Sequence, residues 1–507
     1  MADVLPHDEH NQKLIANVHP HDWQNPTPAD RYNLVVVGAG TAGLVSAMGA
    51  AGLGARVALV ERHLMGGDCL NVGCVPSKAL IRAARVGYQV RHAGEFGVGS
   101  ATQDLTAGEI DFAAVMERMR RLRASISPLD SAQRFADAGI DVFLGDGSFT
   151  SPDTLEVADQ TLEFTRAVIA TGGRAAAPPI EGLEEAGYLT NETVFSLTEL
   201  PARLGVIGGG PIGCELAQSF RRFGSEVHLI NRPDALLNKE EGDAAAIVEK
   251  QFEAEGIHLH TGYQTVRAAR DGAHKQLTIR CGDDEQQLEV DEILVAVGRV
   301  PNTDHLGLDR ADVRYGPRGV EVDDRLRTSN PRIFAAGDVC TKFQFTHAAD
   351  AMARICLQNG LFPFGRGKMS GLVIPRTTYT DPEVASVGLT ARQAAAEGID
   401  IDSYRQDLSH VDRAILDGED AGFAVVHTRK GTDKIVGATI VASHAGEMIG
   451  EITILMTKKL GLGALGGVIH CYPTQVEVLK RIADAYARTR LTPTVASLFK
   501  RWFRWRR

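Results

Sequence analysis

The stretch Leu34-Val-Val-Val-Gly-Ala-Gly-Thr-Ala-Gly43 joins an apolar run to a glycine-rich turn and decides the fold. An alanine-rich segment follows it, and then the apolar run Arg56 to Val60, which ends at Glu61. This order predicts a βαβ unit that binds a dinucleotide, with the carboxylate accepting hydrogen bonds from ribose hydroxyls. Gly38 allows the turn, Gly40 lets the backbone approach a pyrophosphate, and Gly43 lets the helix pack closely on the strand.

A second unit of the same design begins at Leu204, and its turn contains Gly208, Gly210 and Gly213. The chain is therefore predicted to bind two dinucleotides. The second strand of this unit is followed by Asn231 and Arg232. A unit that binds a ribose 2′-hydroxyl would be expected to carry a carboxylate at this position. Arg232 would pair with a 2′-phosphate, which favours NADPH over NADH. The alternative is an ordinary solvated arginine.

Two cysteines stand close together in Gly66-Gly-Asp-Cys-Leu-Asn-Val-Gly-Cys-Val-Pro-Ser-Lys78. A disulfide needs Cα atoms within about 7 Å, whereas a regular helix separates residues five apart by roughly 8 to 9 Å. A bridge between Cys69 and Cys74 therefore implies a distorted turn, which Asn71 and Gly73 tolerate. Pro76 suits the first turn of a following helix, so Cys74 would lie at its N-terminus, where the helix dipole and nearby Lys78 stabilise a thiolate. The alternative is two unrelated buried cysteines.

Composition narrows the class of protein. A chain of 507 residues predicts two to four domains, and 44% hydrophobic residues with 53 glycines are typical of an α/β protein. The net charge of -10 argues against nucleic-acid binding, and seven cysteines do not make a secreted disulfide framework. We expect a cytoplasmic location, because neither a secretory signal nor a long apolar stretch is recognisable.

The two ends of the chain differ from its middle. Residues 1–30 are polar and rich in histidine, and we interpret them as an extension on the surface, with a weak metal site as an alternative to solvated histidines. From about Val373, alternating segments predict antiparallel strands with helices near 390–397 and 446–460, a separate α+β domain. The last ten residues mix basic and large apolar side chains. They suit either an anionic membrane surface or packing on the protein.

Together these motifs resemble the flavin-dependent pyridine nucleotide-disulfide oxidoreductases, the family of glutathione reductase, dihydrolipoamide dehydrogenase and mercuric reductase. The resemblance runs from about Tyr32 to about Ala487. It implies an FAD domain at 31–174 and 302–372, an NAD(P)H domain at 175–301, a homodimerisation domain at 373–487, and a basic aromatic tail at 488–507. The fold class is thus α/β, with two Rossmann-like domains and a C-terminal α+β domain.

The resemblance also implies roles for residues. Electrons pass from NAD(P)H to the flavin and then to a Cys69–Cys74 disulfide, with Cys74 beside the flavin and Cys69 facing the outside substrate. Lys78 and Glu215 match the family's lysine and its carboxylate partner near the flavin, although both could be ordinary helix surface residues. The expected cofactor-binding residues are Gly38, Gly40, Gly43, Glu61, Gly67, Gly208, Gly210, Gly213, Arg232, Gly298 and Asp338. No fixed metal site is expected, only transient binding of a soft metal substrate at the two cysteines.

The sequence departs from the family's disulfide reductases at His470-Cys-Tyr-Pro-Thr-Gln-Val-Glu477. They carry a histidine where this chain has Tyr472, and a tyrosine with a pKa near 10 is a poor base. Glu477 remains at the carboxylate position. Tyrosine here is similar to mercuric reductase, in which it faces the partner's cysteine pair, although this chain lacks that enzyme's N-terminal Cys-x-x-Cys domain and terminal cysteine pair.

Three functions are therefore predicted. The leading one is reduction of a thiophilic metal ion or another small oxidant by a homodimeric NAD(P)H oxidoreductase. The second is reduction of a small disulfide, with His470 replacing the missing histidine base. The third is a redox sensor or a membrane-associated electron-input component with a protein or quinone acceptor. His470 and Cys471 would either take part in the site with Tyr472 or pack at the dimer interface.

Overall fold

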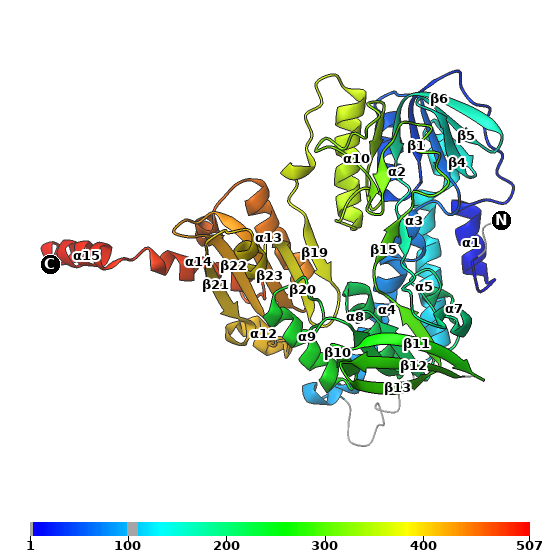
Figure 1. Ribbon diagram of the computed structural model, residues 1–507. Coiled ribbons are helices and arrows are strands. Elements are labelled where there is room, and N and C mark those ends of the chain that lie inside the picture. Colours follow the sequence, from blue (N-terminus) through cyan, green and yellow to red (C-terminus); the bar gives the residue numbers. More distant parts are fainter. Residues whose placement is uncertain (1–3, 99–109, 273) are drawn as a thin grey trace. The chain divides into compact units, whose positions relative to one another are not determined.

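A computed structural model of the chain describes residues 4–98, 110–272 and 274–507 (Figure 1). The chain divides into two compact units. Unit 1 comprises residues 1–208, 216–230 and 263–372, and unit 2 comprises residues 209–215, 231–262 and 373–507. Within the described ranges, every helix is too short or too polar to cross a bilayer. The borders predicted between the nucleotide domains stay a prediction.

The first glycine-rich motif belongs to a sheet of unit 1 with the strand order β3-β2-β1-β6-β5-β4, in which β18 also pairs with β6. Four of its pairings are parallel: β1 with β2, β1 with β6, β2 with β3, and β18 with β6. The parallel strands are almost wholly buried and rich in valine, as expected of a sheet covered on both faces. The bounds are β1 Tyr32–Val37, β2 Val57–Glu61, β3 Ile140–Leu144, β4 Gly147–Ser151, β5 Thr154–Val157, β6 Gln160–Ile169 and β18 Ile333–Ala335.

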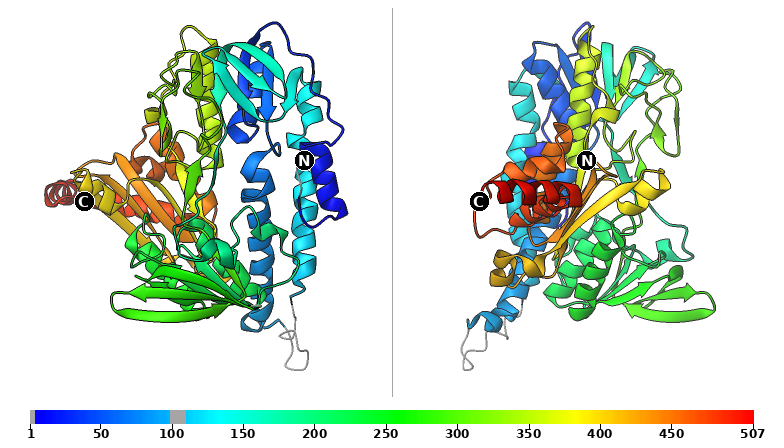
Figure 2. Two further views of the ribbon diagram at one scale, coloured as in Figure 1. Left: turned by 45° about the vertical axis from the view of Figure 1, so that its right-hand side comes forward. Right: turned by 90° about the vertical axis from the view of Figure 1, so that its left-hand side faces the viewer.

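Helices α2 (Thr41–Gly52) and α10 (Thr346–Leu361) pack on each other beside this sheet. They meet closely because α2 has a glycine at the contact: a Cβ at Gly49 would lie 2.5 Å from the Leu357 side chain. Figure 2 shows the long helices α4 (Cys74–Arg91) and α5 (Phe112–Ile126) side by side in the same unit. The start of α4 carries the cysteine pair.

The second glycine-rich motif lies between two more parallel strands. β8 (Arg203–Ile207) pairs with β9 (Glu226–Asn231) and with β14 (Glu292–Val295), and α8 (Pro211–Phe223) follows the turn. A three-stranded antiparallel sheet is formed by β11 (Gln264–Asp271), β12 (His274–Cys281) and β13 (Asp284–Val290). The two βαβ units predicted from the sequence are thus confirmed.

Unit 2 contains a five-stranded antiparallel sheet with the order β19-β20-β23-β22-β21. Its core also takes side chains from three α-helices, among them Ala414, Ile452 and Ile482. The predicted antiparallel strands and flanking helices are confirmed, and with them the predicted fold class. The bounds are β19 Pro375–Thr378, β20 Glu383–Gly388, β21 Ile401–Asp407, β22 Phe423–Arg429, β23 Ile435–Ala442, α11 Ala391–Ala396, α12 Asp412–Asp417, α13 Ala445–Thr457, α14 Glu477–Thr489 and α15 Pro493–Trp505.

The interpretation of residues 1–30 as a surface extension is wrong. Residues Glu9–Val18 form helix α1, whose N-cap Asp8 accepts a hydrogen bond from the backbone of Asn11. Leu14 and Val18 are fully buried in the core of unit 1. Their spacing of four residues is a helical signal that polar neighbours hide. The remaining elements are α6 Ala132–Asp137, α7 Leu183–Ala186, α9 Gly242–Ala254, β7 Gly173–Ala175, β10 His258–Thr261, β15 Arg299–Pro301, β16 Tyr315–Gly316 and β17 Gly319–Val320.

Candidate active site

The cysteine pair lies at a break between two helices. Cys69 is in α3 (Gly67–Asn71), and Cys74 is the first residue of α4. Gly73 forms the corner, with φ −133° and ψ −115°, and a Cβ there would lie 2.7 Å from the carbonyl oxygen of Asp68. Glycine is therefore required for the close approach of the two helices. The distorted turn, the helix start at Cys74 and the place of Pro76 in the first turn are confirmed.

The thiols of Cys69 and Cys74 face each other. A hydrogen bond with Cys74 and burial raise the pKa of the Cys69 thiol well above its usual range. Cys74 is exposed, and its Sγ lies 3.4 Å from Oγ1 of Thr346, at the start of α10. Cys74 lies at the N-terminus of α4, where the helix dipole favours a thiolate.

An arginine joins the cysteine segment to Asp338. Arg299 hydrogen-bonds Asp68, the neighbour of Cys69, and its Nε donates to Oδ2 of Asp338 at 3.2 Å. Burial works against the charge of Arg299, but the two carboxylates outweigh it and raise its pKa. Burial also raises the pKa of Asp338. Asp338 follows β18 as predicted, and it lies close to the redox segment.

The first glycine turn has the features of a phosphate cradle. A Cβ at Gly38 would lie 2.4 Å from the carbonyl oxygen of Ala170, and one at Gly43 would lie 1.8 Å from that of Gly38. Gly40, the N-cap of α2, faces Gly67 instead, and a Cβ at Gly67 would lie 2.7 Å from the Cα of Gly40. Side chains at these two positions would fill the space in front of the helix N-terminus. The turn therefore fits the pyrophosphate of a dinucleotide such as FAD.

Glu61 closes this site at the end of β2. Its Oε2 accepts the Ala39 N–H at 2.6 Å, and its Oε1 accepts the His63 N–H at 2.8 Å. Burial raises its pKa despite these hydrogen bonds. Each carboxylate oxygen has a further lone pair, so Glu61 can still accept a hydrogen bond from a ribose hydroxyl.

The second turn repeats this arrangement with an amide. Oδ1 of Asn231 accepts the Gly209 N–H at 3.0 Å, as Glu61 accepts that of Ala39. Gly208 has φ 116°, and no heavy atom among the described residues would lie within 4 Å of a Cβ at Gly210. Arg232 is exposed directly after Asn231. Gly213 lies in α8, and Gly298, with φ 135°, lies between β14 and β15.

Lys78 and Glu215 lie in different units. Lys78 is half-buried on α4, one turn after Cys74. Glu215 is buried on α8, and its Oε1 accepts the Tyr379 N–H at 2.9 Å. Their pairing with each other stays a prediction.

In unit 2, His470 and Tyr472 have different surroundings. The His470 side chain is only 4% exposed, and its Nε2 lies 3.1 Å from Oε2 of Glu451. Tyr472 is 71% exposed and donates its hydroxyl hydrogen to Oδ2 of Asp412 at 2.8 Å. Each side chain therefore has its own acidic partner, and a site of His470 and Tyr472 that faces Cys69 of the other subunit stays a prediction. Cys471, between them, is an exposed free thiol.

Glu477, at the start of α14, lies near Tyr472. Its Oε1 accepts a hydrogen bond from Nε of Arg481 at 3.1 Å, and Arg481 also pairs with Asp412. Oε2 of Glu477 is buried without a hydrogen-bond partner among the described residues. The carboxylates of Asp412 and, to a smaller extent, Glu477 raise the pKa of Tyr472. Tyr472 is therefore held in its neutral form, as a donor and not as a base.

Sequence reasoning missed several residues at the site. Thr346 and Arg299 reach the cysteine segment from distant parts of the chain, and Arg123 donates to the backbone carbonyl of Asn71 at 2.6 Å. Asp412 is the acceptor for Tyr472. No motif marks these residues, because each acts through a partner far away in sequence.

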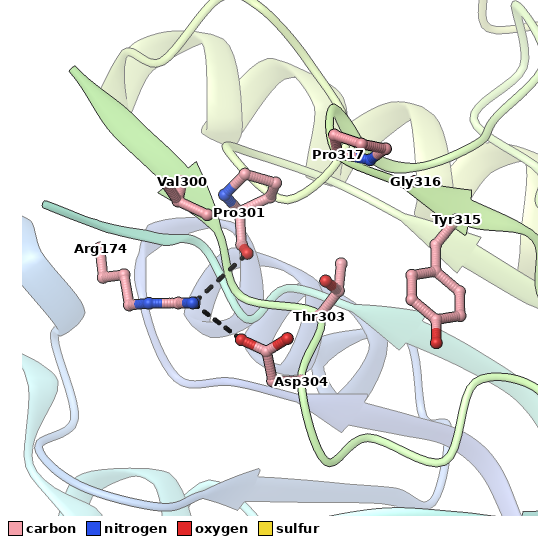
Figure 3. Close-up of a pocket in the computed structure, with 8 residues that line it drawn as sticks. All are labelled: Arg174, Val300, Pro301, Thr303, Asp304, Tyr315, Gly316 and Pro317. Carbon is pink, nitrogen blue, oxygen red and sulfur yellow. Dashed lines mark hydrogen bonds and ion pairs between the residues drawn. The ribbon is translucent and has the colours of Figure 1, made fainter. Parts of the chain in front are cut away.

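A pocket of about 360 Å³ lies elsewhere in unit 1 (Figure 3). At its wall, Arg174 hydrogen-bonds the Pro301 carbonyl and pairs with Asp304 at 2.8 Å. Its lining residues are Arg174, Val300, Pro301, Thr303, Asp304, Tyr315, Gly316 and Pro317. None of them was predicted as a site residue, and this lining includes neither Cys69 nor Cys74 and no glycine of the two turns.

Comparison with known proteins agrees with this geometry. The family of pyridine nucleotide-disulphide oxidoreductases matches residues 32–353, and the dimerisation domain of these proteins matches residues 374–483. A mercuric reductase of Streptomyces lividans is 36% identical over 90% of this chain and 96% of that protein. A dihydrolipoyl dehydrogenase of Chlamydia muridarum is 33% identical over 89% of this chain and 95% of that protein.

Two solved structures are similar along almost their whole length. LpdA from Mycobacterium tuberculosis has a TM-score of 0.80 and 25% identity, over 90% of this chain and 99% of that one. The Cu(II) complex of the HOCl-induced flavoprotein disulfide reductase RclA from Escherichia coli has a TM-score of 0.78 and 27% identity, over 88% and 98%.

Proposed function

Because the chain belongs to the pyridine nucleotide-disulphide oxidoreductase family, an NAD(P)H-dependent flavoprotein family, we propose that it reduces a thiophilic metal ion through Cys69 and Cys74. The observation that carries this proposal is the pair of facing thiols, one exposed, at the start of α4. Thiolates are soft ligands and bind ions such as Hg(II) and Cu(I) preferentially. The dimerisation-domain match supports a homodimer.

FAD is the family's cofactor, and when bound it supplies two-electron transfer between the nicotinamide and the dithiol. The residues that would hold it are the first glycine turn with Gly67, the Glu61 carboxylate and Asp338. For the nicotinamide nucleotide, NADPH is proposed over NADH. Asn231 brings no carboxylate to the ribose 2′ position, and the exposed Arg232 is free of any described ion pair that would compete with a 2′-phosphate.

Two features support a metal ion as the acceptor. Relatives with 33 to 36% identity are named mercuric reductase, and one structural neighbour is a Cu(II) complex. Tyr472 is held neutral at the position where a disulfide reductase needs a base. Each NADPH releases two electrons, which reduce one Hg(II) to Hg(0), or two Cu(II) to Cu(I), and leave NADP⁺ and a proton.

Reduction of a small disulfide is the second candidate, and the His470–Glu451 contact favours it. A carboxylate that contacts one ring nitrogen orients the imidazole, as a catalytic histidine requires. His470 is, however, almost completely buried, whereas a base for an outside thiol must reach that thiol.

The test is steady-state NADPH oxidation with Hg(II), Cu(II), oxidised glutathione, lipoamide or a quinone as the acceptor. Turnover with metal ions and not with disulfides is expected, and Cys69→Ser and Cys74→Ser should each lower it by at least about 10²-fold. Cys281→Ser is the matched control, because Cys281 is exposed and free on β12. Turnover restricted to disulfides, or cysteine variants as active as the parent, would reject the proposal.

A further inference from the structure

Helix α15 (Pro493–Trp505) ends the chain beyond residue 483, where the family match stops (Figure 1). The helix is well formed: Thr492 caps its first turn by accepting the Val495 N–H, and Pro493 lies at its first position. None of its residues is buried. An amphipathic helix that buries nothing in its own subunit has a free apolar face, which needs an occupant.

The helix has two chemically different faces. At about 100° per residue, one side carries Val495, Leu498, Phe499, Trp502, Phe503 and Trp505. The opposite side carries Lys500, Arg501 and Arg504. Among the apolar residues, Trp505 is 76% exposed and Phe503 is 60% exposed. The aromatic rings form one strip, with Phe499 6.3 Å from Phe503 and Trp502 5.3 Å from Trp505.

The charge of this segment is opposite to that of the chain. Residues 493–507 contain five basic side chains and no acidic one, whereas the whole chain carries −10. The basic residues are Lys500, Arg501, Arg504, Arg506 and Arg507. The partner is therefore anionic and must also take up a strip of large aromatic side chains. A nucleic-acid backbone would pair with the basic side chains but leave the aromatic strip exposed to water. An anionic bilayer surface would pair with the basic side chains and also bury the aromatic strip.

We propose that α15 docks this protein on the anionic surface of a lipid bilayer. The 13 residues of α15 span about 20 Å, less than the roughly 30 Å of a bilayer's hydrocarbon core, so the helix lies in the plane of the interface. The tryptophans and phenylalanines enter the boundary between headgroups and acyl chains, and the basic face pairs with lipid phosphates. This inference does not depend on the electron acceptor.

Vesicle flotation of the intact FAD-loaded protein tests the proposal. We expect binding to vesicles of phosphatidylglycerol and phosphatidylcholine in equal parts, and at least about tenfold weaker binding to phosphatidylcholine alone. Phe499→Gln with Trp502→Gln removes half of the aromatic strip, and Lys500→Gln with Arg504→Gln removes two of the five positive charges. Each pair should weaken binding at least about tenfold. Phe364→Ala with Arg366→Gln, an exposed aromatic and basic pair in unit 1, is the matched control and should bind like the parent.

Tryptophan fluorescence gives a second readout that does not depend on activity. The chain has three tryptophans, and two are on α15. The third, Trp23, is half-buried and donates to the Val142 carbonyl at 3.1 Å. In a Trp23→Phe variant, the emission maximum should shift to shorter wavelength when anionic vesicles are added and stay unchanged with neutral ones.

Four results would overturn the proposal. The first is equal recovery with neutral and anionic vesicles, or none with either. The second is undiminished binding by the aromatic-strip variant. The third is a change in oligomeric mass on deletion of residues 493–507 without any vesicle binding by the parent, which would assign the apolar face to a second copy of the chain. Binding to duplex DNA in place of vesicles would likewise assign the basic face to nucleic acid.

Discussion

Arg123 is a buried guanidinium that connects two distant segments at the redox site. Its Nη1 donates to the Asn71 carbonyl and its Nη2 to Oδ1 of Asn11, both at 2.6 Å. Burial, together with neighbouring Arg120, lowers its pKa to about 10, so it stays charged at neutral pH. It thereby holds the short α3 helix, with Cys69, against α1 and α5.

Arg123→Met should destabilise the protein by roughly 3 kcal/mol, because two buried acceptors lose their donor. Urea unfolding of parent and variant measures the difference. Arg121→Met is the control, since Arg121 is exposed on the same helix. A loss no larger than that of the control would contradict the role assigned to Arg123.

Asp412 sets the ionisation of Tyr472. Its carboxylate accepts the phenol hydrogen and opposes a phenolate charge, which raises the pKa of Tyr472. Asp412→Asn removes the negative charge, so the pKa of Tyr472 should fall toward 10 and its absorbance at 295 nm should rise at lower pH. The titration of Tyr472 is isolated by subtracting, from the absorbance of each protein, the absorbance of the same protein that also carries Tyr472→Phe. Asp417→Asn, on the same helix, should leave the titration in place, and an Asp412→Asn titration that coincides with the parent would refute the assignment.

Arg232 is expected to select the nicotinamide nucleotide. Arg232→Glu places a carboxylate where the proposed 2′-phosphate lies, so the KM for NADPH should rise at least about tenfold while that for NADH falls or stays constant. Turnover with NADH in the same variant is the internal control for folding. An unchanged ratio of the two KM values would make Arg232 a solvated arginine.

At the scale of single elements, the corner between α3 and α4 is the most constrained. Gly73→Ala would place a Cβ 2.7 Å from the Asp68 carbonyl oxygen and force the two helices apart. We expect a loss of about 1 to 3 kcal/mol in stability and slower turnover with every acceptor. Gly52→Ala, at the end of α2 with open space around it, is the matched control. Equal behaviour of the two variants would show that the corner can relax.

Local patterns predicted most elements, and long-range contacts account for what they missed. The turn between Cys69 and Cys74 could be predicted because Asn71 and Gly73 lie inside it. The βαβ units could be predicted because a glycine-rich turn directly follows a run of apolar residues in each of them. Helix α1 was missed because it has few apolar residues, and their burial depends on the distant core residues that they pack against. Thr346, Arg299 and Asp412 could not be predicted, since each is defined by a partner from a remote segment.

At the scale of the whole molecule, we predict from the resemblance a dimer in which Tyr472 of one subunit lies near the cysteines of the other. Subunits carrying Cys69→Ser and subunits carrying Tyr472→Phe should then complement each other. In a random mixture, half of the dimers are hybrids with one intact site, so about a quarter of the parental activity should return. The single-variant homodimers are the controls. A mixture no more active than they are would mean that Tyr472 does not serve the cysteines of the partner subunit.

The N-terminal helix also has a consequence for how this chain can be shortened. A version trimmed to residue 32, where the family match begins, would lose Leu14 and Val18 from the core and Asn11 from Arg123. The damage would not stay at the amino end, because Arg123 also holds the carbonyl of Asn71, between the two cysteines. Proteolytic cleavage within the first twenty residues would therefore loosen the segment that carries Cys69 and Cys74, although it would remove no residue that faces the substrate.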